Sequence, residues 1–270
     1  TWNIPDEQYE TFLNLYYNEV VAKKKKEYYT ERQLPDEGAI AIDLDFRHDV
    51  NIDERQYNLN HIITFIDTYV SKIEELFEIV DEDVSIPIYV FEKPKVNQDK
   101  VKNVTKDGIH VIIGLNCNCL IKQILRTHML TEISSIFDDI SMLDDWTWDS
   151  VFDEGVAHAT TPWQLFGSRK PNHDKYELTR VFNLTIDVEN QEFIRSEIPI
   201  QDFKIKENIY KLSVRYPDHD SLMMNNTCAN LFKELQEKKN KKNNEVQIMQ
   251  NKFTQNIISD TSFESIMMNS

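Results

Sequence analysis

The sequence is poor in glycine, in cysteine and in long apolar runs. Its 270 residues include five glycines and three cysteines, and two of the cysteines, Cys117 and Cys119, lie only one residue apart. Cysteines in this number and spacing make no disulfide framework, which favours a reducing compartment. The apolar runs are far shorter than the roughly 20 residues that a membrane helix needs, and no basic-then-apolar segment opens the chain. We therefore expect neither a membrane span nor secretion.

Several nucleotide-binding and hydrolase motifs are also missing. The sequence has no Walker A loop, no dinucleotide-binding glycine fingerprint, no G-x-S-x-G elbow and no structural zinc spacing. It has no excess of basic residues either, because 46 acidic and 30 basic residues give a net charge of −16. This charge argues against a domain that holds nucleic acid by bulk electrostatics, and leaves room only for a local basic groove. Without an initial Met and with a polar end, the sequence is expected to be a fragment of a longer protein.

The apolar residues that are present predict both helices and strands. Helices are expected at 6–29, 55–80 and 117–139, and strands at 39–46, 86–91, 109–115, 148–153, 161–167 and 177–187. Beyond residue 190 the pattern weakens, although 210–216 alternates like a strand and 222–235 has helical spacing. The fold class is therefore α/β or α+β, with mixed sheets flanked by helices.

Asp43 and Asp45 are the most informative pair of residues. They alternate along the apolar segment 39–46, so a strand there places both carboxylates on one face, about 6 to 7 Å apart. Two neighbouring carboxylates in an apolar strand are costly when they are ionised and unpaired, and a divalent cation relieves that cost. Hard oxygen ligands suit Mg²⁺ or Mn²⁺. The alternative is an edge strand whose acids pair with Arg47 or another base.

Two further clusters have the chemistry to bind phosphate. His110 enters a predicted strand behind Lys106 and Gly108, where its ring is able to donate a hydrogen bond to a phosphate oxygen. The alternative is a structural histidine. Asp153 ends an apolar run and adds a third acid. The turn after Gly167 adds hydroxyl, backbone and cationic donors at Ser168, Arg169 and Lys170. Three acids with such a turn are typical of two-metal phosphoryl or nucleotidyl transfer, and the alternative for the turn is a solvated loop.

In order and character these clusters resemble the archaeo-eukaryotic primase superfamily, specifically the N-terminal primase domain of primase-helicases from nucleocytoplasmic large DNA viruses. That superfamily carries Asp-x-Asp on an apolar strand, then small-x-His, then an apolar residue followed by an acid, and then Ser-x-Lys. The matching segments are Ile42 to Phe46, Gly108 to His110, Phe152-Asp153 and Ser168 to Lys170. The resemblance covers about residues 38–188 and leaves the N-terminal helix outside. The sequence departs from the family pattern at Gln164, where related primases often carry an arginine.

The resemblance implies a primase core with an RNA-recognition-like catalytic sheet. Asp43, Asp45 and Asp153 would bind two catalytic metal ions, Mg²⁺ or Mn²⁺. The triphosphate of an incoming nucleotide would be held by His110, Lys170, Arg169, Ser168, Lys106 and Gly108. The implied domains are an N-terminal helical segment at 1–37, the catalytic core at 38–190, its C-terminal part at 191–236, and a linker or tail at 237–270 toward a helicase region.

The implied function is template-directed nucleotidyl transfer from nucleoside triphosphates to a 3′-hydroxyl on a single-stranded DNA template in viral DNA replication. The implied partners are that template, nucleoside triphosphates and a covalently linked helicase domain, in the cytoplasm of an infected host cell. Two alternatives stay open at this point. One is a metal-dependent nuclease, which uses the same acids for attack by water. The other is a catalytically silent module that binds nucleic acid or a partner protein.

Overall fold

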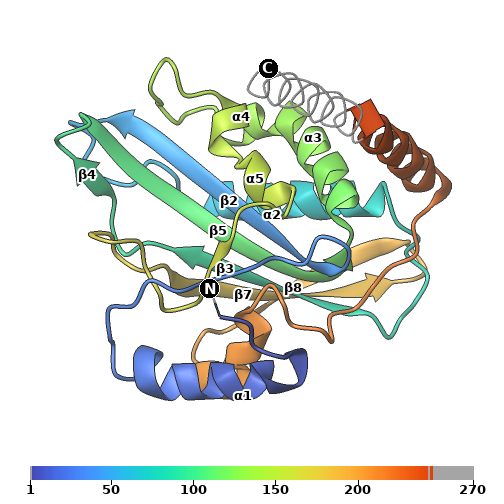
Figure 1. Cartoon of the computed structure of the whole chain (residues 1–270). Helices are drawn as coiled ribbons and strands as arrows, with labels where there is room; N and C mark the ends of the chain where they lie inside the picture. The colour runs from blue at the N-terminus through green and yellow to red at the C-terminus, as the bar shows by residue number, and fades with distance from the viewer. Residues whose placement is uncertain (1, 243, 246–270) are drawn as a thin grey trace, which may run out of the picture. The chain divides into compact units, whose positions relative to one another are not determined.

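The computed structural model describes residues 2–242 and 244–245, and the chain divides into two compact units, one ending at Asn225 and the other beginning at Asn226. The first unit is organised on a six-stranded sheet in the order β2-β5-β3-β7-β8, with β4 beside β5 (Figure 1). Its strands are β2 (Gly38–Asp49), β3 (Ser85–Glu92), β4 (Asn97–Asp99), β5 (Val104–Cys117), β7 (Glu177–Asp187) and β8 (Glu192–Ile198). All their pairings are antiparallel, where the sequence predicted mixed sheets.

Helices lie on both faces of this sheet (Figure 1). One face carries α2 (Leu59–Glu74), α3 (Cys119–Ile136), α4 (Trp148–Val151) and α5 (Glu154–Ala157). The other carries α1 (Asp6–Tyr16), the π turn η1 (Tyr17–Val21), α6 (Ile205–Asn208) and the 3₁₀ turn η2 (Ile209–Leu212). A separate two-stranded sheet joins β1 (Thr30–Glu31) to β6 (Trp163–Gln164).

Side chains along β2 point alternately to the two faces of the sheet. Leu44 and Phe46 are fully buried on the side of the helices, and the Phe46 ring lies 5.3 Å from that of Phe137 at the end of α3. At the start of β2 the pairing register shifts around Ala39, whose carbonyl oxygen accepts a hydrogen bond of 2.7 Å from the buried ammonium of Lys122. The apolar run at 39–46 correctly predicts this strand, although β2 ends the strand order and so lies at the edge of the main sheet. We call the face that carries Leu44 and Phe46, beside α2 and α3, the helix-covered face.

Most of the central elements are confirmed, with ends shifted by a few residues. The strands expected at 39–46, 86–91, 109–115 and 177–187 are β2, β3, β5 and β7, and the helices expected at 55–80 and 117–139 are α2 and α3. The helix expected at 6–29 is wrong in its second half. It passes into the π turn at Tyr17 and ends before Lys24, whose φ of 51° is left-handed.

Three other predictions fail for local reasons. Within 148–153, residues Trp148–Val151 form α4 instead of a strand, because the Thr147 side chain caps the helix by accepting from the Ser150 amide. Within 161–167 only Trp163–Gln164 are extended. Residues 210–216 alternate in sequence, yet they begin in the 3₁₀ turn η2 and bring the rings of Tyr210 and Tyr216 within 5.2 Å.

The second unit contains a helix at 226–242, which begins four residues later than the helix expected at 222–235 and runs further. Of the linker or tail expected at 237–270, residues 237–242 and 244–245 are helical, and the remaining residues lie outside the described ones. Within the residues that the structure describes, we find no helix long and apolar enough to cross a bilayer.

Candidate active site

Three consecutive cross-strand pairs line one face of β2 and β5. Asp43 lies opposite His110, Asp45 opposite Gly108, and Arg47 opposite Lys106. Alternation along β2 turns these residues away from Leu44 and Phe46, and so away from α2 and α3. The side chains of Asp43 and Asp45 are 18% and 39% exposed, so both carboxylates are accessible to a ligand. The pairing brings together residues from two of the predicted clusters.

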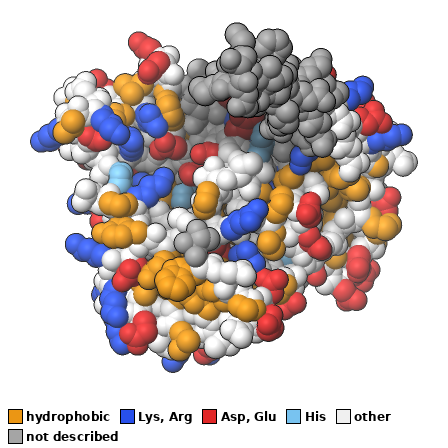
Figure 2. Space-filling model, viewed as in Figure 1, with side chains coloured by type: hydrophobic (Ala, Val, Ile, Leu, Met, Phe, Trp, Pro, Cys, Tyr) orange, Lys and Arg blue, Asp and Glu red, His pale blue; other side chains and the backbone are white. Residues whose placement is uncertain are grey.

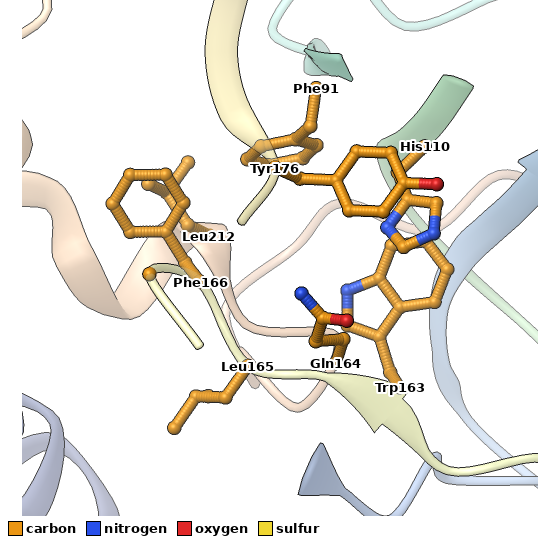
Figure 3. Close-up of a pocket in the computed structure, with 9 residues that line it drawn as sticks. Phe91, His110, Trp163, Gln164, Leu165, Phe166, Tyr176 and Leu212 are labelled. Carbon is orange, nitrogen blue, oxygen red and sulfur yellow. The ribbon is translucent and has the colours of Figure 1, made fainter. Parts of the chain in front are cut away.

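His110 is held firmly against Asp43. Its Nε2 atom lies 3.4 Å from Oδ1 of Asp43. The imidazole is stacked on the ring of Tyr176 at 3.6 Å between centroids and lies 4.5 Å from the ring of Trp163 (Figure 3). With aromatic rings packed against it, the histidine has little freedom to leave the carboxylate.

Gly108 makes this packing possible. A Cβ atom at this position would lie 2.8 Å from both the Leu44 carbonyl oxygen and the Tyr176 hydroxyl oxygen. Only glycine therefore lets the Tyr176 side chain lie over the strand beside the carboxylates. Burial raises the pKa of Tyr176, and the charges of Asp43 and Asp45 raise it further, so the phenol is neutral.

The two carboxylates differ in their electrostatic surroundings. Burial alone would raise the pKa of Asp43, but His110, then Lys170 and Lys93, outweigh it and hold this pKa below its ordinary value. Burial also raises the pKa of Asp45, and there the charge of Asp43 adds to the effect instead of opposing it. Asp43 is thus ionised before Asp45, and the second negative charge is poorly compensated.

Lys93 is a site residue that sequence reasoning did not assign. It follows β3, and its carbonyl oxygen accepts a bond of 2.6 Å from Arg55, which also makes two bonds of 2.8 and 3.1 Å to the buried Asp107. The ammonium lies 5.0 Å from the centroid of the Tyr176 ring. Burial lowers the pKa of Lys93, and Lys170 lowers it further, against the opposing effect of Asp45. The sequence signal was its place at the end of a predicted strand, in a segment that also resembles the primase family.

Asp153 is connected to the site by a hydrogen bond of its main chain. Its amide donates a bond of 3.0 Å to the Asp43 carbonyl oxygen, and Arg126 fixes the preceding residue with two bonds of 2.9 and 2.7 Å to the Phe152 carbonyl oxygen. Its carboxylate, however, caps α5 by accepting 2.9 Å from the Val156 amide. Across residues 2–242 and 244–245, no three His, Cys, Asp or Glu side chains are grouped closely enough to hold a metal ion. The three-acid site therefore stays a prediction.

The turn that carries Lys170 is anchored by its neighbours. The Ser168 hydroxyl is fully buried, donates 2.8 Å to the Glu27 carbonyl oxygen and accepts 2.6 Å from the Tyr29 amide. Gln164 donates 2.7 Å to the Ser168 carbonyl oxygen, and Gly167 has a φ of +82° that favours glycine. Ser168 is thus occupied in positioning the turn, and its predicted contact with nucleotide stays a prediction, as does that of Arg169.

A cavity behind His110 is too small for substrate. It is lined by the residues drawn in Figure 3, among them Phe91, Trp163, Phe166 and Tyr176, and it encloses about 10 Å³. A single water molecule needs about that volume. The cavity therefore leaves no room for a nucleotide beside the His110 ring.

A comparison with protein families shows that the chain is a primase-type protein. Residues 1–182 match the family model described as the C962R protein N-terminal AEP domain, where AEP denotes the archaeo-eukaryotic primases, and the chain belongs to this family. The antiparallel sheet flanked by helices is the primase core. Because the match begins at residue 1, it includes the N-terminal helix that the motifs alone left outside.

The chain is also similar to a protein of Acanthamoeba polyphaga mimivirus named "Putative helicase L207/L206". The two are 32% identical over 214 residues, which are 77% of this chain and 21% of the mimivirus protein. The chain thus spans about a fifth of the length of that relative.

Proposed function

We propose that this domain transfers nucleotides from nucleoside triphosphates to a 3′-hydroxyl on a single-stranded DNA template. The observation that carries the proposal is the pair Asp43 and Asp45, accessible on one sheet face beside the cations of Lys93, Lys106 and Lys170. Among the described residues no carboxylate lies within 4.0 Å of any of these three ammonium groups. Cations that are close to acids but not paired with them suit a ligand that brings both phosphates and metal ions.

The carboxylate pair fits divalent cations. Asp43 and Asp45 supply hard oxygen donors, and burial together with the charge of Asp43 raises the pKa of Asp45, a cost that a bound cation would relieve. When bound, Mg²⁺ or Mn²⁺ would lower the pKa of the 3′-hydroxyl and offset charge on the leaving pyrophosphate. Asp153 would join them through its other carboxylate oxygen, since only Oδ1 accepts the bond that caps α5.

The basic residues have separate tasks in this proposal. Lys170 and Lys93 neutralise the triphosphate, and His110 donates a hydrogen bond to it while staying packed against Tyr176. The nuclease alternative needs no such grip on a triphosphate, because its attacking group is water. The proposal and its alternative therefore differ in which ligand depends on these side chains.

Titration of a labelled nucleoside triphosphate in Mn²⁺ tests this difference. Lys170→Gln and His110→Ala should each weaken triphosphate binding by about 1.5 to 3 kcal/mol, the value of a charge-assisted contact. Lys175→Gln is the matched control, because this nearby lysine already has Glu177 at 3.6 Å. Equal triphosphate affinity of wild type and both variants, with loss only of oligonucleotide affinity, would favour the nuclease.

A second titration tests the metal proposal without relying on activity. Asp45→Asn should weaken Mn²⁺ binding, followed by electron paramagnetic resonance, and should abolish nucleotide incorporation. Asp49→Asn is the control, since Asp49 ends the same strand and its carboxylate is bonded to Asn51. Normal Mn²⁺ binding by Asp45→Asn would remove these carboxylates from the metal site.

We further propose that the domain works joined to a helicase. The mimivirus relative is named as a helicase and is about five times the length of the matched region. A primase joined to a helicase stays close to the single-stranded DNA that unwinding exposes. This proximity would offset the weak DNA affinity of an acidic domain. The downstream coding sequence tests this proposal, because it should contain a Walker A loop followed by a helicase core.

A further inference from the structure

A basic hairpin extends from the same sheet face. It comprises residues 93–106, in which β4 pairs with the start of β5. This segment contains five lysines and one acid, Asp99, in a chain whose net charge is −16. Figure 2 shows Lys and Arg side chains along the left margin, where Figure 1 places β4. The charge of the hairpin is thus opposite to that of the protein as a whole.

The lysines of the basic hairpin are not neutralised by the protein. Among the described residues no carboxylate lies within 4.0 Å of Lys95, Lys100 or Lys102, all of which are exposed. The carboxylate of Asp99 is used within the turn, where it accepts 3.1 Å from the Lys102 amide. The run at Lys23 to Lys26 behaves differently, because Glu19 pairs with two of its members.

The basic hairpin is continuous with the candidate active site. Arg47 and Lys106 lie directly opposite each other, one step beyond Asp45 and Gly108 on the same face. Like charges in this arrangement destabilise a sheet, and Asp45, at 3.5 Å from Arg47, offsets only part of the cost. The Arg47 guanidinium also lies 3.6 Å over the Trp146 ring. A polyanion lying across this pair would remove the repulsion.

From these contacts we infer that the basic hairpin and the Arg47–Lys106 pair bind the phosphate backbone of the single-stranded DNA template. The inference rests on the proposed function, since it gives the path by which a strand reaches the acids. Exposed and unpaired lysines release counterions when phosphates bind them. The Arg47 guanidinium covers one face of the Trp146 ring, so a base would stack on the other face. A binding path lined by basic residues along one edge of the sheet suits a single DNA strand.

The test is a salt titration with a labelled oligothymidylate, followed by fluorescence anisotropy, on the complete chain. The variant Lys95→Gln/Lys100→Gln/Lys102→Gln should bind at least about tenfold more weakly at low salt. Its plot of log affinity against log salt should be shallower by about 2, because each phosphate contact to a single strand contributes about 0.7. The control Lys24→Gln/Lys25→Gln/Lys26→Gln changes the net charge equally and should leave the slope unchanged.

The outcomes separate this inference from the proposed function. An unchanged slope for the hairpin variant, or an equal loss in both variants, overturns the inference. Loss of triphosphate affinity with oligothymidylate affinity intact overturns it as well, because the hairpin would then belong to the nucleotide site. If no variant and not even the wild type incorporates nucleotides, the proposed function fails, while the slopes still decide whether the hairpin binds the strand.

Discussion

The two faces of β2 differ in burial and in their contribution to stability. On the helix-covered face Ile42, Leu44 and Phe46 are almost completely buried and contribute their apolar area to stability. On the open face Asp43 and Asp45 are partly exposed, and the pKa of Asp45 is raised by burial and by its neighbour. One strand thus carries residues that stabilise the fold directly beside residues that cost stability. Substitutions on the two faces should separate folding from activity.

The largest effect is expected on the helix-covered face. Phe46→Ala should lower the free energy of unfolding by about 3 to 5 kcal/mol, because it leaves a cavity beside Tyr57 and Phe137. Urea denaturation followed by fluorescence measures the loss. Triphosphate affinity of the fraction that stays folded should be near that of the wild type. A loss below about 1 kcal/mol would mean that this face is not the main support of the strand.

A pH effect is expected at the other end of the sheet face that carries Asp43, where the side chains are buried. The His219 ring lies over Gly114 of β5, where an added Cβ would meet its Nδ1 at 2.7 Å, and burial lowers its pKa to about 4. Asp220 and Asp218 oppose this shift, and Lys211 adds to it. The folded state therefore keeps the imidazole neutral as pH falls below 6.5, while the unfolded chain takes up a proton. Stability should fall by about 2 to 3 kcal/mol between pH 7 and pH 4.5 from this group alone.

Thermal unfolding of wild type and His219→Gln at both pH values isolates this contribution. Carboxylates titrate in the same range in both proteins, so only the difference between the two pH dependences counts. The variant should lose less stability than the wild type on acidification. Parallel losses would show that His219 is protonated in the folded protein at pH 4.5.

Sequence reasoning succeeded where the spacing of apolar residues alone decides the structure of a segment. The buried strands β2, β3 and β5 and the helix α2 follow their apolar patterns, and the alternation of Asp43 and Asp45 correctly predicts that they share a face. It missed β8, because this edge strand is exposed or half-exposed along its whole length and has no apolar face to detect. It also placed a strand at 148–153, where a threonine cap and the grip of Arg126 favour a short helix.

Part of the candidate site depends on contacts that no local pattern records. Lys93 enters the site because Arg55, 38 positions earlier, holds its carbonyl oxygen. Ser168 lies in a motif, yet its hydroxyl is bonded to residues about 140 positions away. The sequence therefore predicts which residue types meet, but the side-chain partners of each residue follow from long-range packing.

Arg126 connects the two faces of β2. It lies in α3, which packs on the helix-covered face, and its guanidinium donates hydrogen bonds to the carbonyl oxygen of Phe152, the residue before Asp153. Arg126→Met should cost about 2 kcal/mol of stability by leaving the Phe152 carbonyl oxygen without its donor. If Arg126 positions Asp153, the variant should also lower kcat for incorporation with little change in triphosphate affinity. Arg126→Lys should restore part of both. A stability loss with unchanged kcat would limit Arg126 to a structural role.

The smallest effect, and the sharpest test of the comparison, is the stability of Asp45→Asn. Because the folded state raises the pKa of Asp45, the ionised carboxylate costs stability once pH rises above its ordinary value, and asparagine removes that cost. The side chain is 39% exposed, so solvent screening limits the gain to at most about 1 kcal/mol at pH 7 in metal-free buffer. The advantage of the variant should shrink toward pH 4. Addition of Mn²⁺ should reverse the order, because a cation that binds only the folded wild type stabilises it by mass action. A variant that is less stable than wild type without metal, by differential scanning calorimetry, would show that Asp45 supports the fold in the same way as its neighbours on the helix-covered face.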